Sequence, residues 1–237
     1  RGETYSYVMI NVCGPNSRKL LERTTKDDVS NKNFKFCQCQ HITVGYAPVL
    51  ALRVTYVGEL GYELYMPAEY AGHIYELLWE EGHNLGVANA GYRAIDSLRL
   101  EKGYRYWSAE VTPDYNPYDA GLGFCVALEK GDFVGRKALL KIKEEGPKWK
   151  LCCFTLDIDK PMLLHGGETI CYKGEVLGVV TSGGYGHTVR KTIAYGCVAA
   201  EHSNYNKGYE IEVYKEVIPA TRHERVLYDP ERKKILM

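Results

Sequence analysis

Glu63 is the residue of this sequence whose setting best suits ligand binding. It lies in a stretch that reads as two alternating segments, residues 52–56 and 62–66, around the turn Gly58-Glu59-Leu60-Gly61. Because side chains alternate along a strand, Glu63 points away from the face that carries Tyr62, Leu64 and Met66. A carboxylate held there by a rigid hairpin can accept paired N–H donors from a planar heterocycle, which is a strong and orienting interaction.

A second pair of candidate residues is Arg99 and Glu101, at the end of a helix that Asn89 can cap. The expected buried stripe of this helix consists of Tyr92, Ile95 and Leu98. Arg99 lies beside that stripe, where an ion pair with Asp96 is available. Two interpretations stay open: the pair belongs to a functional site, or it locks the helix to its neighbours by hydrogen bonds.

The elements before this helix predict an α+β layer. Residues 5–12 read as a strand, 17–23 as a short helix, 24–48 as an irregular polar segment, and 69–82 as an amphipathic helix. With the two arms of the hairpin, the order is β-α-β-β-α, which is typical of a ferredoxin-like or related fold. In the irregular segment, Asp27 and Asp28 are expected to be solvated caps rather than catalytic carboxylates.

After the helix that carries Arg99, the sequence predicts a loop over residues 112–123, a short strand at 124–128 and a lysine-rich helix at 133–145. Gly146-Pro147-Lys148 then marks a boundary, because the helical period vanishes beyond it. We therefore expect two domains, residues 1–148 and residues 149–237.

The second domain is expected to be a small antiparallel β-barrel. Five strands are predicted, at 150–156, 169–172, 175–180, 192–199 and 209–213, with a two-residue hairpin at Lys173-Gly174. The glycine-rich residues 181–186 read as a barrel corner or as a backbone nest for an anion. The charged tail from Arg222 is expected to be frayed.

Composition excludes some classes of function. The 237 residues carry 30 basic and 30 acidic side chains, so no basic field for nucleic acid or anionic membrane is implied, and no apolar run is long enough to span a membrane. The eight cysteines lack the usual zinc spacing, since Cys37-x-Cys39 is too close and has no partner pair, so we expect reduced thiols and no metal site.

Two motifs carry a resemblance to a known family. The pattern Tyr-x-Gly-Glu-x-Gly-Tyr-Glu at residues 56–63, with Arg-Leu-Glu at 99–101, resembles the folate-binding aminomethyltransferases. That family contains the glycine cleavage T-protein and the C-terminal halves of sarcosine and dimethylglycine dehydrogenases. The string from Asn89 to Trp107, with residues 116–117 and 120–122, is most similar to the sarcosine dehydrogenase type. The resemblance covers residues 7 to 220.

The resemblance implies a site for tetrahydrofolate in the central hole of a three-domain fold. Glu63 matches the glutamate that holds the pteridine ring, and Tyr56 matches a tyrosine that lines the pocket. No catalytic residue is assigned, because the family's acidic motif precedes the matched region and Asp27-Asp28 falls in the wrong place. Ile95 stands where the glycine-cleavage members have an arginine for the folate tail, which favours the dehydrogenase members.

The expected function is therefore that of a C-terminal folate-binding part of a sarcosine or dimethylglycine dehydrogenase. Such a part captures the one-carbon unit from oxidative demethylation as 5,10-methylenetetrahydrofolate. FAD would bind an upstream domain of the parent protein, because this sequence has no G-x-G-x-x-G motif, and the segment alone is expected to be inactive. The resemblance places the parent in the mitochondrial matrix, although residues 1–12 show no transit pattern.

Three alternatives use the same fold. One is the non-catalytic regulatory subunit of pyruvate dehydrogenase phosphatase, another is a glycine-cleavage aminomethyltransferase, and the third is a folate-dependent tRNA-modification protein. The neutral charge disfavours the third. A measurement of folate binding separates the leading interpretation from the regulatory subunit.

Overall fold

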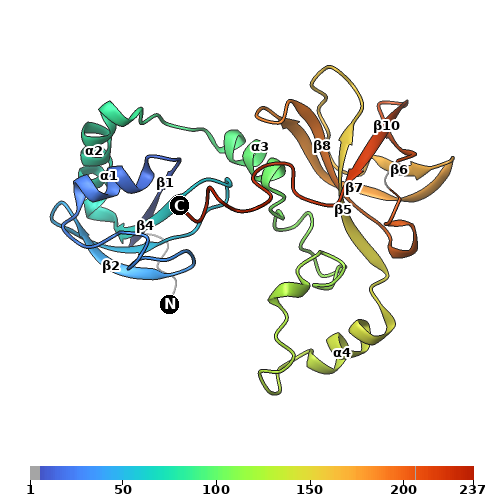
Figure 1. Cartoon of the computed structure of the whole chain (residues 1–237), viewed down its shortest axis with the longest axis horizontal. Helices are drawn as coiled ribbons and strands as arrows, with labels where there is room; N and C mark the ends of the chain where they lie inside the picture. Colours follow the sequence, from blue (N-terminus) through green and yellow to red (C-terminus); the bar gives the residue numbers. More distant parts are fainter. Residues whose placement is uncertain (1–5, 206) are drawn as a thin grey trace. The chain divides into compact units, whose positions relative to one another are not determined.

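The computed structural model describes residues 6–205 and 207–237. It divides into two compact units, which are Arg1–Asp96 with Glu231–Met237, and Ser97–Pro230 (Figure 1). We call them unit 1 and unit 2. The expected division into domains 1–148 and 149–237 stays a prediction.

Unit 1 is a four-stranded antiparallel sheet with two helices on one face (Figure 1). The strand order is β1-β4-β3-β2, so β1 and β2 form the edges of the sheet. The elements are β1 (Tyr7–Cys13), α1 (Ser17–Thr24), β2 (Cys39–Val44), β3 (Ala47–Leu52), β4 (Gly61–Pro67), α2 (Ala71–Gly82) and the short 3-10 helices η1 (Ala68–Tyr70) and η2 (His83–Leu85).

Alternation along β4 builds the core of unit 1. Tyr62, Leu64 and Met66 are fully buried, as the sequence predicted. They belong to the same apolar cluster as residues of both helices, among them Leu21 of α1 and Ile74 of α2. Burying a large apolar side chain contributes about 1.5–3 kcal/mol, so this cluster fixes which face of β4 points inward.

The hairpin around Glu63 differs from the prediction in its first arm. That arm is β3 (Ala47–Leu52), and residues 53–60 form a wide connection instead of a tight glycine turn. Two causes are visible. The backbone of Arg53 pairs with Cys37 and Gln38, and the side chains of Val57 and Leu60 are buried in the interior.

The prediction that residues 24–48 are irregular was wrong in its second half, where β2 and the start of β3 lie. β2 is an edge strand with one exposed face. Polar residues on that face make its apolar alternation hard to recognise in the sequence.

Helix α3 (Tyr92–Lys102) begins in unit 1 and ends in unit 2. Two predictions for this helix were wrong: Asn89 does not cap it, and Tyr92 is not part of its buried face. Asn89 lies before the helix and donates a hydrogen bond to the Tyr75 hydroxyl at 2.8 Å, while Tyr92 is 70% exposed. The buried part of α3 is its last turn, which includes Arg99 and Leu100.

Unit 2 contains a closed six-stranded antiparallel barrel, which confirms the predicted fold class (Figure 1). The strand order around it is β10-β5-β8-β7-β6-β9. The elements of unit 2 after α3 are η3 (Gly123–Cys125), α4 (Arg136–Glu145), β5 (Trp149–Leu156), β6 (Thr169–Tyr172), β7 (Glu175–Gly186), β8 (Lys191–Ala199), η4 (Ala200–His202), β9 (Tyr209–Val213) and β10 (Glu216–His223).

The predicted hairpin at Lys173-Gly174 is confirmed, because Tyr172 pairs with Glu175 and both turn residues have positive φ. Three other predictions for unit 2 were wrong. The strand at 124–128 is replaced by η3, residues 181–186 continue β7 past a register shift instead of forming a corner, and the tail from Arg222 contains the end of β10.

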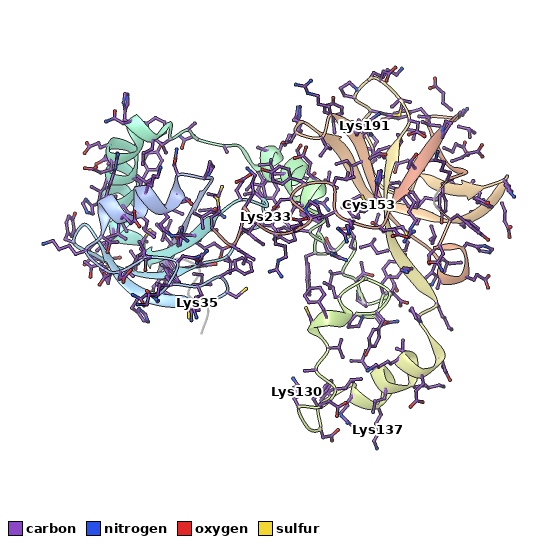
Figure 2. The ribbon with its side chains drawn as sticks, viewed as in Figure 1. Lys35, Lys130, Lys137, Cys153, Lys191 and Lys233 are labelled. Atoms are coloured by element: carbon purple, nitrogen blue, oxygen red, sulfur yellow. The ribbon has the colours of Figure 1, made fainter. Side chains whose placement is uncertain are left out.

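The adjacent cysteines of β5 point to opposite faces of the strand, since Cys152 and Cys153 belong to different buried clusters. All eight cysteines have free thiols. Burial raises the pKa of the Cys153 thiol to about 12, so this thiol stays protonated and unreactive at neutral pH. Figure 2 shows Cys153 among the barrel strands.

Gly178 of β7 is predicted to be intolerant of a side chain. A Cβ there would lie 1.9 Å from the carbonyl oxygen of Cys197 on the neighbouring strand, and backbone cannot move aside cheaply. Gly178→Ala should therefore destabilise the chain by about 1–3 kcal/mol or more in denaturant unfolding. Gly72→Ala is the matched control, because a Cβ at Gly72 meets nothing within 4 Å. Equal stability of the two variants would contradict this packing.

Candidate functional site

Glu63 lies on the face of the unit 1 sheet opposite the helices. In the strand register, its Cα pairs with Asn11 of β1 and with Leu52 of β3. Met9 is 45% exposed and pairs with Tyr65 on the same face. We call this surface, defined by Met9, Asn11, Glu63 and Tyr65, the open face of the sheet. The predicted orientation of Glu63 is confirmed.

A neighbour on the same strand orients the Glu63 carboxylate. The Tyr65 hydroxyl donates a hydrogen bond to Glu63 Oε2 at 2.8 Å. This bond is the main cause that raises the pKa of Tyr65, because it favours the protonated phenol beside the carboxylate. Among the described residues, Tyr65 is the hydrogen-bond partner of Glu63, so Oε1 keeps its acceptor capacity. The carboxylate is thus oriented and able to accept further N–H donors.

Tyr56 lies on the connection between β3 and β4, seven residues before Glu63 in the sequence, and its side chain is half-buried. The next residue, Val57, anchors this connection in the interior with 4% exposure. Gly58 has φ +79°, a conformation that favours glycine. The structure therefore gives Tyr56 a defined backbone support, in the same unit as Glu63.

Unit 1 also contains a cavity of about 500 Å³ that the sequence did not predict. It lies along the free edge of β1, and the α2 side chains Tyr75 and Trp79 line it together with residues 85–90. Asn11 of the open face belongs to this lining, whereas Glu63 and Tyr56 do not. Ile95 lines it too, so the wall is apolar at that position. Its lining comes from segments that are far apart in the sequence, so no local sequence pattern indicated it.

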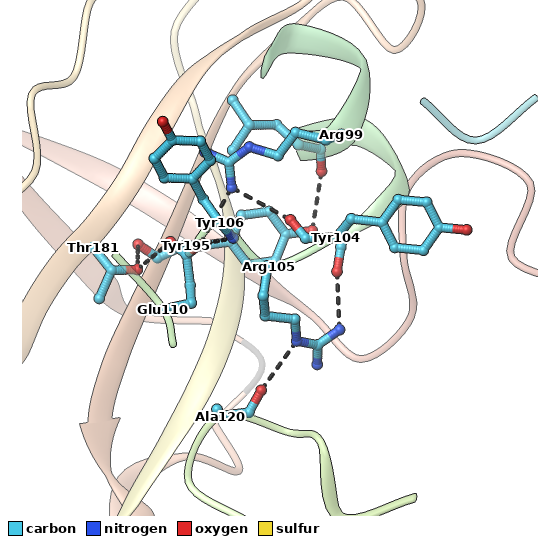
Figure 3. Close-up of polar contacts among 10 residues, drawn as sticks. Arg99, Tyr104, Arg105, Tyr106, Glu110, Ala120, Thr181 and Tyr195 are labelled. Carbon is cyan, nitrogen blue, oxygen red and sulfur yellow. Dashed lines mark hydrogen bonds and ion pairs between the residues drawn. The ribbon is translucent and has the colours of Figure 1, made fainter. Parts of the chain in front are cut away.

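Arg99 is the centre of a buried polar network in unit 2 (Figure 3). Its Nη1 lies 3.3 Å from Glu110 Oε2, and both side chains are at most 2% exposed. Glu110 Oε2 also accepts the backbone N–H of Tyr106 at 2.6 Å, and its Oε1 accepts the Thr181 hydroxyl at 2.7 Å. Glu110 escaped the sequence analysis because it lies alone in a segment without periodic pattern.

Glu101 and Lys102 make further contacts between α3 and the rest of unit 2. Glu101 Oε1 accepts the backbone N–H groups of Thr188 and Val189 at 2.6 and 2.9 Å. Lys102 Nζ lies 2.8 Å from Asp229 Oδ2. These bonds support the interpretation that Arg99 and Glu101 lock the helix to its neighbours.

Both paired aspartates are exposed, as expected, and Asp28 caps a turn, whereas the Asp27 carboxylate bonds to strand β2. Asp27 Oδ2 accepts the backbone N–H of Thr43 at 2.7 Å, and Asp28 Oδ1 accepts that of Ser30 at 2.9 Å. Hydrogen bonding from Ser30 is the main cause that lowers the pKa of Asp28. Within residues 6–205 and 207–237, no group of three or more His, Cys, Asp or Glu side chains is placed to hold a metal ion. No helix in this part of the chain is both long and apolar enough to cross a membrane.

Comparison with known proteins identifies the family. The GCVT N-terminal domain model matches residues 2–130, and the glycine cleavage T-protein C-terminal barrel domain model matches residues 150–229. The chain is similar to the crystal structure of glycine cleavage system aminomethyltransferase T from Bartonella henselae. The TM-score is 0.82 at 26% sequence identity, over 94% of this chain and 60% of that one.

Two of the similar proteins are dehydrogenases that are named after their substrates. The mitochondrial dimethylglycine dehydrogenase of Rattus norvegicus is 38% identical over 233 residues, which are 96% of this chain and 27% of that protein. The mitochondrial sarcosine dehydrogenase of Mus musculus is 37% identical over 235 residues, with 96% and 25% covered. The chain thus spans about a quarter of the length of these relatives. From the domain models, these relatives and the matched fold, the chain belongs to the glycine cleavage T-protein family.

Proposed function

We propose that this chain is the folate-binding part of a dehydrogenase that demethylates an N-methylated glycine, either sarcosine or dimethylglycine. Its task is to hold tetrahydrofolate, which accepts the released one-carbon unit as 5,10-methylenetetrahydrofolate. The similarity to dehydrogenases of both substrates supports this class. The observation that carries the folate assignment is the Glu63 carboxylate, oriented by Tyr65 on the open face.

The chemistry of the residues fits the proposed ligand. A pteridine ring presents neighbouring N–H groups along one edge, and a carboxylate accepts two such groups in parallel. Glu63 is held on a central strand with hydrogen-bonded neighbours on both sides, so little conformational entropy is lost when it binds. Tyr56, on its anchored connection, is proposed to line the pocket.

The chain's contribution to the reaction is positioning. A reactive one-carbon unit released elsewhere in a protein is captured faster when the acceptor is already bound nearby, because a bimolecular encounter becomes effectively intramolecular. In this proposal Glu63 fixes the orientation of the ring, and the chain itself carries out no oxidation. FAD belongs to another part of the parent protein, and the mitochondrial names of the relatives support a matrix location.

The test is a calorimetric titration of tetrahydrofolate into the 237-residue chain under anaerobic conditions. Saturable binding of one molecule per chain is expected. p-Aminobenzoylglutamate lacks the pteridine ring and should bind at least about tenfold more weakly, because the charged hydrogen bonds to the ring contribute about 1.5–3 kcal/mol. Absence of tetrahydrofolate binding would overturn the proposal and favour a regulatory role for the fold.

A further inference from the structure

Asn11 stands beside Glu63 on the open face of the unit 1 sheet. The two residues are Cα partners in the antiparallel pairing of β1 with β4, which lie side by side in Figure 1. Directly opposite residues of an antiparallel pair project to the same face, with Cβ atoms about 4.5–5.5 Å apart. The Asn11 side chain is exposed, so a molecule that binds the Glu63 carboxylate from the open face also meets the Asn11 carboxamide.

The other neighbours of Glu63 on this face have different chemistry. Leu52 of β3 is its Cα partner on the opposite side and is apolar. Met9, which pairs with Tyr65, is also apolar and is 45% exposed. The Tyr65 hydroxyl is a polar group, but it already donates its proton to Glu63 Oε2. Of these neighbours, Asn11 is the one that can bring an N–H donor to a molecule bound at Glu63.

The Asn11 carboxamide has no hydrogen-bond partner in the part of the chain that the structure describes. Two other asparagines that line the same cavity use their amides inside the protein. Asn16 Nδ2 donates to the carbonyl oxygen of Leu85 at 3.1 Å, and Asn89 Nδ2 donates to the Tyr75 hydroxyl at 2.8 Å. In contrast to these two amides, the amide of Asn11 is available to a ligand.

The fold itself gives no reason for an asparagine at this position. Asn is depleted in strands, because its short polar side chain competes with the ladder for backbone hydrogen bonds. The rest of β1 reads Tyr-Val-Met-Ile before Asn11 and Val-Cys after it, so the strand is otherwise built from residues that suit a sheet. Because the carboxamide makes no bond that stabilises the sheet, contact with a ligand is the role that its surroundings leave.

We propose that Asn11 is a second ring-binding residue of the folate site, where its Nδ2 donates to a ring acceptor next to the N–H groups that Glu63 accepts. This inference rests on the proposed function. In the pteridine ring of tetrahydrofolate, the 2-amino and N3–H donors are flanked by an acceptor on each side, the C4 oxygen and N1. A carboxylate offers acceptors only, so recognition of the flanking acceptor requires a donor beside it. Glu63 and Asn11 together select a donor pair with an adjacent acceptor.

The experiment is a calorimetric titration of the 237-residue chain with tetrahydrofolate and with p-aminobenzoylglutamate, which lacks the ring. Asn11→Leu keeps the approximate size of the side chain but removes its donor. Tetrahydrofolate should bind this variant about three- to tenfold more weakly, as expected for one neutral hydrogen bond. p-Aminobenzoylglutamate should bind the variant and the unchanged chain alike. Equal weakening of both ligands would show that Asn11 does not read the ring and would overturn the proposal.

Asn11→Asp sharpens the test, because shape and hydrogen bonding predict opposite orders. Aspartate is closer to asparagine in shape than leucine is, but its carboxylate has no donor and adds a second negative charge beside Glu63. Tetrahydrofolate should therefore bind Asn11→Asp more weakly than Asn11→Leu, and at least about tenfold more weakly than the unchanged chain. Asn84→Asp makes the same change of charge at an exposed position of η2 and should leave the affinity unchanged. A smaller loss for Asn11→Asp than for Asn11→Leu would refute donation by Asn11.

The folate function and the role of Asn11 fail in different ways. If the unchanged chain does not bind tetrahydrofolate, the proposed function is wrong and this inference with it. If Glu63→Gln weakens binding but neither variant of Asn11 does, Glu63 remains the anchor and the role of Asn11 is refuted. Thermal unfolding of Asn11→Leu should have its midpoint at or above that of the unchanged chain, because Asn disfavours strands. A lower midpoint would assign the carboxamide to the fold and overturn the proposal.

Discussion

Replacement of Glu63 by glutamine is expected to weaken tetrahydrofolate binding at least about tenfold. The change keeps the shape of the side chain, but it places an NH2 donor where the proposed ring presents its own N–H groups. Loss of one partner of a desolvated, charged hydrogen-bond pair costs about 2–5 kcal/mol, and 1.4 kcal/mol is about tenfold in affinity. Calorimetric titration of the 237-residue chain measures the effect directly.

Two control variants separate a ring anchor from a general effect of charge. Glu76→Gln removes the same charge from the exposed side of α2 and should leave the affinity unchanged. Tyr65→Phe removes the hydroxyl that orients Glu63, so it should weaken binding by less than the change at Glu63 itself. If Glu63→Gln and Glu76→Gln bind tetrahydrofolate equally well, Glu63 is not the anchor and the open face only supports the fold.

The orientation of Glu63 was predictable from the sequence because it depends on a single local rule. Strand alternation forces Glu63 away from Tyr62 and Leu64 once those residues are buried. The path of residues 53–60 was not predictable in the same way. It depends on burial of Val57 and Leu60 by residues distant in the sequence, and tertiary packing overrode the glycine turn signal.

The barrel could be predicted from strand and turn signals in the sequence, whereas the contacts of the C-terminal residues 235–237 could not. Lys173-Gly174 sets a hairpin through its own backbone conformation. The tail reads as charged and frayed because Ile235 is its sole deeply buried residue, and the partners of residues 236 and 237 lie about 200 positions away. Long-range polar contacts of this kind leave no periodic trace in a sequence.

The Arg99–Glu110 pair is expected to give the largest loss of stability on removal of one partner. Arg99→Met leaves the Glu110 carboxylate in an interior position, still bonded to Thr181 and to the Tyr106 backbone but without its cation. Breaking a buried ion pair in this way costs about 3–5 kcal/mol. Glu110→Gln should cost a similar amount, because the Arg99 guanidinium loses its carboxylate and one acceptor is replaced by a donor.

A double-mutant cycle measured by denaturant unfolding separates the pair from its surroundings. In Arg99→Met with Glu110→Gln neither charge is left alone, so the double variant should lose less than the sum of the single losses, by about 0.5–3 kcal/mol. The surface pair Lys141–Glu145, 3.7 Å apart and largely exposed, is the matched control, and Lys141→Met should change stability by at most about 1 kcal/mol. Additive losses in the buried cycle would mean that Arg99 and Glu110 stabilise unit 2 through separate contacts, and the ion pair would then not be what locks the end of α3.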